Sequence, residues 1–238
     1  MEVRTLWREP EFDRDKIEWG ALEFRDVFRI YRSGPVETVA LRGLDLKIEH
    51  GELVAIFGPS GSGKSTMLHL AAGLDELSAG DVRVGGRSLA RLTEGELAGY
   101  RARGVALVFQ NGNLWPGLSA RENVVLSLQL GDRSPTAAVV DDALAAFGLT
   151  DRRRQSAATL SGGEQQRVAI AAAAARQAPL VLADEPTAEL DEHNEQLVLD
   201  ALRRLRDDFA ATVVVVTHSS RVADAADRVV EIRDGKAV

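Results

Sequence analysis

Cysteine is absent from the sequence, which excludes disulfide bonds and thiolate metal sites. Long apolar runs are missing as well: the most apolar stretches, 168–175 and 213–216, are far shorter than the roughly 20 residues of a membrane-spanning helix. Residues 1–20 mix acids, bases and tryptophans and lack the apolar centre of a signal peptide. We therefore expect a cytoplasmic protein that does not cross the membrane itself.

Basic residues are outnumbered by acidic ones, 29 against 36, which gives a net charge of −7. A nucleic-acid backbone attracts basic surfaces, so this balance argues against a nucleic-acid partner. The one compact basic run, Arg152 to Arg154, is short and typical of a solvated loop. With 238 residues, the chain is long enough to bury a sizeable core in one large domain or two small ones.

Short apolar strands alternate with helical segments along most of the chain. Residues 53–57, 180–183 and 212–216 are continuous apolar runs of the kind found in strands that are buried on both faces. A helix is expected at 64–72, and a hairpin closes the chain at 229–238. Strands that alternate with helices pair in parallel, so the pattern predicts an α/β fold with a parallel sheet covered on both faces.

Two regions depart from this alternation. Residues 22–27 and 42–48 alternate between apolar and polar side chains, and they predict an antiparallel β portion near the N-terminus. Residues 89–165 are mostly helical in pattern and predict an inserted helical subdomain. We expect a single domain at 21–238, preceded by a polar extension at 1–20.

A glycine-rich loop follows the strand at 53–57 and leads into the helix at 64–72. It matches the pattern G-x-x-x-x-G-K-S, whose glycines let backbone N–H groups turn toward a polyphosphate at a helix N-terminus. We expect Lys64 to reach the β- and γ-phosphates and the Ser65 hydroxyl to bind Mg²⁺. The loop consists of Gly58, Pro59, Ser60, Gly61, Ser62, Gly63, Lys64, Ser65 and Thr66.

Two neighbouring carboxylates follow the strand at 180–183. An acid at this position supports Mg²⁺ in phosphate-loop enzymes, which suits Asp184. Glu185 points the other way on an extended backbone and is placed to polarise a water for in-line attack on a phosphate. The second acid favours hydrolysis over transfer of the phosphoryl group to another substrate.

A third motif at 160–167 begins a helix. Ser161 is suited to the N-cap position, and Glu164 three residues later completes a capping box. Gly162 and Gly163 are poor helix formers in the first turn, and their bare backbone N–H groups can face an anion. The motif, Leu-Ser-Gly-Gly-Glu-Gln-Gln-Arg, resembles the signature sequence of ABC ATPases and is far more specific than the phosphate loop.

The resemblance to ABC ATPases extends from about residue 21 to residue 238. It implies a phosphate-loop ATPase core that binds ATP and Mg²⁺. It also implies that Ser161, Gly162, Gly163 and Glu164 contact the ATP held by the phosphate loop of a second chain. Two copies of the chain, forming a homodimer, would then hold two ATP molecules head to tail between them.

Other positions take roles from the same resemblance. Tyr31 stands where an aromatic ring stacks on adenine, although a lone tyrosine also suits packing. Gln110, at the end of a strand at 105–109, resembles the glutamine that links Mg²⁺ and the attacking water to the helical subdomain. Asp191 corresponds to a residue that reaches across the dimer, and His218 to the histidine that contacts the γ-phosphate. The implied metal-binding residues are thus Ser65, Gln110 and Asp184, and the catalytic residues are Lys64, Gln110, Glu185 and His218.

Within the family, the chain resembles the ATPases of lipoprotein-release, macrolide-export and cell-division permease systems. The shared segments are 58–66, Asn113 and Leu114 with Pro116, 160–170 and 182–187. The chain departs from the family pattern at three places: Ala172 replaces an arginine, Ala188 and Glu189 replace a commoner pair, and Ser219 replaces an aspartate. The change at Ala172 puts the coupling between the signature helix and the Asp191 loop in doubt.

The expected function is Mg²⁺-dependent ATP hydrolysis that drives a separate membrane permease, with the chain held on the inner face of the membrane through that permease. One rival is an ABC ATPase of DNA repair or translation. The segment 67–159 is too short for the coiled coil of the repair type, and the chain lacks the second ATPase module of the translation type. The other rival is a weakly catalytic regulatory subunit, against which Lys64, Glu185 and His218 argue.

Three large apolar residues, Leu114, Trp115 and Leu118, lie close together in a loop that contains glycine and proline. Loops normally lie at the surface, so the cluster either packs under the helical subdomain or forms a docking patch. The family resemblance favours docking, because the groove that receives the cytoplasmic helix of the permease lies in this region.

Overall fold

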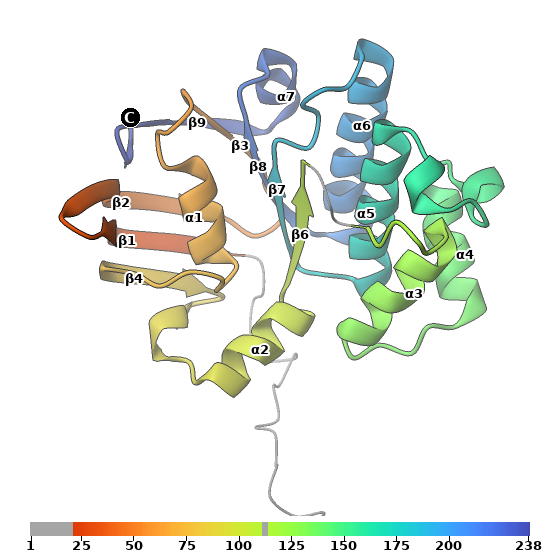
Figure 1. Cartoon of the computed structure of the whole chain (residues 1–238), viewed down its shortest axis with the longest axis horizontal. Helices are drawn as coiled ribbons and strands as arrows, with labels where there is room; N and C mark the ends of the chain where they lie inside the picture. Colours follow the sequence, from red (N-terminus) through yellow and green to blue (C-terminus); the bar gives the residue numbers. More distant parts are fainter. Residues whose placement is uncertain (1–20, 111–113) are drawn as a thin grey trace, which may run out of the picture.

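The computed structural model describes residues 21–110 and 114–238, and these form two sheets with helices around them (Figure 1). Asn113, one of the positions shared with the family, lies outside the described residues, whereas the apolar cluster of Leu114, Trp115 and Leu118 lies within them. The first sheet is antiparallel, with the order β2-β1-β4-β5, and the second has the order β10-β9-β3-β8-β7-β6. The predicted combination of an antiparallel β portion and a parallel sheet is confirmed.

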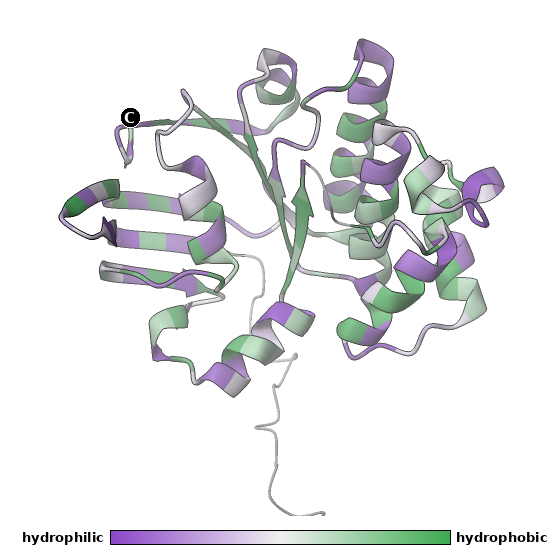
Figure 2. Ribbon diagram, viewed as in Figure 1, coloured by the Kyte–Doolittle hydropathy of each residue, from purple (hydrophilic) through white to green (hydrophobic). Residues whose placement is uncertain are grey.

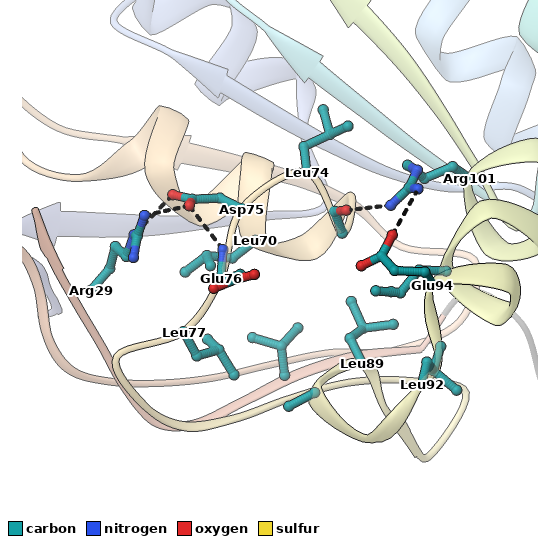
Figure 3. Close-up of a pocket in the computed structure, with 14 residues that line it drawn as sticks. Arg29, Leu70, Leu74, Asp75, Glu76, Leu77, Leu89, Leu92, Glu94 and Arg101 are labelled. Carbon is teal, nitrogen blue, oxygen red and sulfur yellow. Dashed lines mark hydrogen bonds and ion pairs between the residues drawn. The ribbon is translucent and has the colours of Figure 1, made fainter.

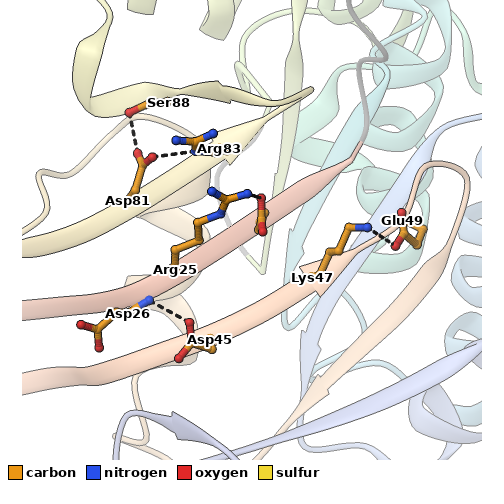
Figure 4. A network of polar contacts seen from close by, with 9 residues as sticks. Arg25, Asp26, Asp45, Lys47, Glu49, Asp81, Arg83 and Ser88 are labelled. Atoms are coloured by element: carbon orange, nitrogen blue, oxygen red, sulfur yellow. Dashed lines mark hydrogen bonds and ion pairs between the residues drawn. The ribbon is translucent and has the colours of Figure 1, made fainter.

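The antiparallel sheet comes from the first half of the chain. Its strands are β1 (Leu22–Ser33), β2 (Val36–Ile48), β4 (Ala79–Val84) and β5 (Arg87–Ser88). The strands β1 and β2 are longer than the sequence pattern predicts, because bulges in β1 shift the alternation of side chains partway along the strand. Polar side chains on this sheet pair with one another, as Arg25 does with Glu23 and Arg83 with Asp81 (Figure 4).

The second sheet is parallel except for its last strand. It contains β3 (Leu53–Phe57), β6 (Val105–Phe109), β7 (Leu180–Asp184), β8 (Thr212–Thr217), β9 (Arg228–Arg233) and β10 (Lys236–Ala237). The last two strands pair antiparallel, which confirms the predicted terminal hairpin. Figure 2 shows the central strands as the most hydrophobic part of the molecule, as expected for strands that are covered on both faces.

Side chains on the two faces of the parallel sheet enter two separate cores. On β8, Val213 and Val215 belong to the core that contains buried side chains of α3, α4, α5 and α6. Val214 and Val216 point the other way and pack with α1 and the antiparallel sheet. The period of two along a strand thus divides one apolar run between both layers.

The helices are α1 (Lys64–Ala71), α2 (Glu94–Arg103), α3 (Ala120–Leu130), α4 (Ala137–Ala146), α5 (Gly162–Arg176), α6 (Glu192–Phe209) and α7 (Ser220–Ala225). The range 89–165, which sequence patterns assign to a helical subdomain, includes the strand β6. This strand pairs with β7 at the edge of the parallel sheet, because its short apolar run suits a buried strand. The helices α3 and α4, which pack on α5, come after it. Over the described residues, no helix is both long and apolar enough to span a membrane.

Gly80 holds the bulge in β1 against β4. The φ of Gly80 is +90°, and a Cβ at this position would lie 2.2 Å from the carbonyl oxygen of Asp26. Asp26 also has a positive φ, of +47°. The Asp26 oxygen belongs to the backbone, so the rotation of a neighbouring side chain cannot make room for a Cβ at Gly80. The absence of a side chain at Gly80 is therefore a requirement of strand packing.

We predict that Gly80→Ala lowers the free energy of unfolding by about 2 kcal/mol or more, the sum of a left-handed backbone and an overlap in a packed region. The matched control is Gly34→Ala, where φ is +58° but a Cβ would meet no atom within 4 Å. This control should lose only about 1 kcal/mol. Urea denaturation of both variants measures the difference. Equal losses would show that the contact with Asp26 contributes nothing.

Candidate active site

The phosphate loop connects the end of β3 to the start of α1, as the sequence predicts. It lies against two other strands. A Cβ on Gly58 would be 2.2 Å from the carbonyl oxygen of Ile232, and one on Gly63 would be 2.4 Å from that of Ala40. These two glycines are therefore needed for close packing, and they hold the loop in the curved form that presents backbone N–H groups to an anion.

Lys64 is buried at the first position of α1. Its Nζ donates hydrogen bonds to the carbonyl oxygens of Gly58, at 2.8 Å, and Pro59, at 2.9 Å. The ammonium group therefore lies against the loop, and its positive charge is close to the space that the loop encloses. A cation held this way stabilises a polyphosphate in that space.

A cavity of about 700 Å³ opens above the loop. Most of the residues that were predicted to contact nucleotide line it, although they are up to 187 positions apart in the chain. The lining includes Tyr31, Gly58, Pro59, Ser60, Gly61, Gly63, Lys64, Ser65, Thr66, Gln110, Glu185 and His218. The fold thus brings the adenine, phosphate and hydrolysis residues of the prediction to one cavity.

The register of the parallel strands explains why these residues meet. Asp184 on β7 and Ile56 on β3 both pair with Val216, which lies on β8 between them. Neighbouring strands are about 4.8 Å apart, so Asp184 lies roughly 10 Å from Ile56, two residues before the phosphate loop. One Asp184 carboxyl oxygen, Oδ1, is buried and has no hydrogen-bond partner.

The donor set of Ser65, Gln110 and Asp184 consists of a hydroxyl, an amide and a carboxylate. Magnesium prefers oxygen ligands and usually takes only one or two carboxylates together with substrate phosphates. In the described part of the chain, no three or more acids, histidines or cysteines gather into a metal-binding group. The unpaired oxygen of Asp184 and this sparse set fit a magnesium ion that completes its shell with phosphate oxygens.

Glu185 and His218 face each other at the rim of the cavity. The Nδ1 of His218 lies 3.0 Å from the carboxylate of Glu185. Glu185 adopts a φ of +48°, which is costly for a residue with a side chain, and its N–H donates to the carbonyl oxygen of Val216. Such strain persists only where the surroundings enforce it, and it aims the Glu185 carboxylate into the cavity.

The signature helix α5 contacts the loop that starts at Gln110. The side chain of Gln166 donates to the carbonyl oxygens of Phe109, at 2.9 Å, and Gln110, at 2.8 Å. Gln110 in turn donates to Glu189, at 3.3 Å. Gln166 lies five residues after the N-cap Ser161, and no local pattern in the sequence predicts its contact with residues 56 and 57 positions away.

The predicted capping box at the start of α5 is confirmed. The Ser161 hydroxyl accepts from the Glu164 N–H, and the Glu164 side chain accepts from the Ser161 N–H. Arg152 is exposed, as expected for a solvated basic run, and its guanidinium also donates to Glu164 at 2.7 Å. This hydrogen bond lowers the pKa of Glu164. Gly163 is buried, and a Cβ there would lie 2.5 Å from the side chain of Asn194.

Ser161, Gly162 and Gly163 do not line the cavity above the phosphate loop within the described residues of one chain. Asp191 is the N-cap of α6, where its carboxylate accepts a hydrogen bond from the N–H of Asn194. This hydrogen bond lowers the pKa of Asp191. One chain therefore presents the phosphate loop and the signature at separate places.

The three departures from the family pattern occupy different surroundings. Ala172 lies on α5 in the wall of an apolar groove beside α3, and Asp191 is not among the residues that line this groove. The hydroxyl of Ser219 donates to Glu195 at 2.7 Å. Glu189, one of the residues that depart from the family pattern, accepts a hydrogen bond from Gln110 and adopts a φ of +67°.

Comparison with known proteins gives consistent likenesses. The family model described as "ABC transporter" matches residues 41–188. An uncharacterized ABC transporter ATP-binding protein of Thermotoga maritima is 41% identical over 220 residues, which cover 90% of this chain and 92% of that protein. The macrolide export ATP-binding/permease protein MacB of Shigella flexneri is 42% identical over 91% of this chain and 34% of its own length.

A putative ABC transporter ATP-binding protein of Mycoplasma pneumoniae is 35% identical over 98% of this chain. The chain spans 50% of that relative and about a third of the MacB relatives. Among solved structures, the dimeric ATP-binding cassette MJ0796, bound to ADP and Pi, has a TM-score of 0.83 and 36% identity. The match covers 91% of this chain and 96% of that one.

We predict that Lys64→Ala weakens ATP binding as well as turnover, because the ammonium neutralises phosphate charge before and during the reaction. The loss of a charge-assisted contact should raise the dissociation constant roughly tenfold or more. Titration with a fluorescent ATP analogue measures it, and Lys236→Ala, at an exposed position on β10, serves as the control. Unchanged binding in Lys64→Ala would mean that the loop holds nucleotide without this cation.

Proposed function

Because this chain belongs to the ABC transporter family of ATP-binding proteins, we propose that it powers a separate membrane permease by binding and hydrolysing ATP between two copies of itself. The ATPase activity is that of the family. The assignment to this chain is carried by one observation: the phosphate loop, Glu185 and His218 line a single cavity.

In this proposal, the phosphate loop and Lys64 hold the phosphates, and the Tyr31 ring stacks on the adenine. Ser65, Gln110 and Asp184 hold Mg²⁺, which neutralises charge on the β- and γ-phosphates when it is bound. Glu185 orients the attacking water and accepts its proton. His218, 3.0 Å from that carboxylate, orients Glu185 and contacts the γ-phosphate.

The dimer is proposed because the signature residues lie outside the cavity of their own chain. Ser161 and Gly162 are exposed at the N-terminus of α5, where helix N–H groups and the positive end of the dipole face solvent. A second copy, placed head to tail, can bring these groups to the γ-phosphate. The dimeric arrangement of the cassette bound to ADP and Pi, at 36% identity, supports this placement.

The permease contact is proposed at a groove between the parallel sheet and the helices α3 and α5. Its volume is about 320 Å³, and its wall includes Leu74, Leu114, Trp115, Leu130 and Ala172. Trp115 is 64% exposed, whereas Leu114 is partly buried against the core. The small side chain of Ala172 leaves room in this groove. An exposed aromatic ring beside an apolar groove favours docking of a helix over simple packing.

We predict that Glu185→Gln abolishes steady-state hydrolysis while ATP binding is retained. The amide preserves the shape of the side chain but cannot accept a proton, so turnover should fall by roughly 10² to 10⁴. An ATP-bound dimer should then accumulate and elute earlier on size-exclusion chromatography with ATP. Glu231→Gln, on β9, is the control. Near-normal turnover would remove Glu185 from the role of base.

We predict that Trp115→Ala leaves the isolated chain folded and active but weakens its complex with the co-expressed membrane permease. An interface residue of this type contributes about 2 kcal/mol or more. Permease-stimulated ATP hydrolysis and co-purification measure the effect, with Val229→Ala, exposed on β9, as the control. A lower melting temperature with unchanged permease binding would identify Trp115 as a packing residue.

A further inference from the structure

The side chain of Tyr31 is held by two neighbours that belong to neither the phosphate loop nor the acidic pair. Its hydroxyl donates to Asp75 Oδ2 at 2.7 Å and lies 3.4 Å from the Thr66 hydroxyl. The guanidinium carbon of Arg29 lies 4.4 Å from the centroid of the Tyr31 ring. The ring is therefore fixed at its edge by a carboxylate and covered on one face by a cation.

Asp75 and Arg29 also hold each other. Arg29 donates to both carboxylate oxygens of Asp75, at 2.5 and 3.0 Å, and the N–H of Glu76 donates to one of them at 2.8 Å. Both side chains are largely shielded, with exposures of 20% for Arg29 and 18% for Asp75. A two-point contact in a shielded position orients both partners more tightly than a single surface ion pair does.

The ionised form of Asp75 is the one that this network favours. Burial alone would raise the pKa of Asp75, but hydrogen bonds from Tyr31, the Glu76 amide and Arg29 outweigh burial and lower the pKa. The carboxylate therefore acts only as an acceptor, and the Tyr31 hydroxyl must point its proton toward it.

Two cavities adjoin this network. Tyr31 and Thr66 line the cavity above the phosphate loop, whereas Arg29 and Asp75 line another, of about 880 Å³. Figure 3 shows Arg29 and Asp75 at one end of this second cavity, with Glu94 and Arg101 at the other. Arg29 lines the second cavity and covers one face of the Tyr31 ring, so the other face is the one that remains for the adenine.

We propose that Arg29 and Asp75 are positioning residues that orient the Tyr31 ring for stacking on the adenine of ATP. This inference rests on the proposed role of Tyr31 in the nucleotide site. Asp75 sets the rotation of the ring through the hydroxyl, and Arg29 fills the face that the base does not use. Neither residue contacts the nucleotide, and both act through Tyr31.

The test compares the affinities of the full-length chain for Mg²⁺-ATP and for inorganic triphosphate, which lacks the base, by isothermal titration calorimetry. Asp75→Asn should raise the dissociation constant for ATP about 5-fold, on the order of one hydrogen bond. It should leave that for triphosphate unchanged. Tyr31→Ala should raise the constant for ATP roughly tenfold through lost stacking, again without affecting triphosphate.

A double-mutant cycle separates orientation from general damage to the fold. Tyr31→Phe keeps the ring but removes the hydroxyl, so adding Asp75→Asn to it should have little further effect on ATP binding. The matched control is Asp81→Asn. Asp81 is also a shielded carboxylate in the antiparallel sheet and pairs with Arg83 at 2.7 Å, but it has no contact with Tyr31. Its ATP affinity should remain that of the unmodified chain.

The outcomes distinguish the inference from the function on which it rests. If Tyr31→Ala raises the dissociation constant for ATP but Asp75→Asn does not, positioning by Asp75 is wrong and adenine stacking stands. An equal loss of triphosphate affinity in Asp75→Asn would show that Asp75 acts on the phosphate loop and not on the ring. If Tyr31→Ala has no effect, adenine stacking is wrong and the positioning inference falls with it.

Discussion

The pairing of β8 with both β3 and β7 is the constraint on which the site depends. These three strands run parallel, so their carboxyl ends meet at one edge of the sheet. The residues that follow them are Gly58, His218 and Glu185, and β6 adds Gln110 at the same edge. A shift of register by one residue in any strand would turn these side chains to the opposite face. The apolar cores on both faces of the sheet resist such a shift, because each strand has distinct side chains buried on each side.

The site is strained and close-packed where chemistry requires a fixed geometry. Glu185 has a left-handed backbone, and Gly58 and Gly63 touch the carbonyl oxygens of neighbouring strands. These features cost free energy, which burial of the sheet offsets. The polar contacts of Gln166 with the backbone at Phe109 and Gln110 link the helix that carries the signature to the edge that carries the catalytic residues.

The antiparallel sheet supplies the end of the cavity at which the adenine is proposed to bind. Tyr31 reaches the cavity from β1, while the phosphate loop comes from β3, and the segment after α1 brings Asp75 between them. The second cavity, beyond Arg29 and Asp75, shares Leu74 and Arg101 with the proposed permease groove. The proposed adenine and phosphate ends of the nucleotide site thus come from separate layers of the molecule. The segment 74–77 adjoins Tyr31 at the proposed adenine end, the second cavity and the proposed permease groove.

Short-range patterns in the sequence determined the fold class, the phosphate loop, the acidic pair and the capping box at Ser161, because each depends on residues within a few positions of one another. Tertiary structure alone decided the partners that depend on distant segments: Asp75 at the Tyr31 hydroxyl, Gln166 at the backbone of Phe109, Arg152 at Glu164 and β6 inside the parallel sheet. No local pattern encodes these contacts. They arise from strand register and helix packing, which bring residues 12 to 79 positions apart, from Arg152 with Glu164 to Gln110 with Glu189, into hydrogen-bonding distance.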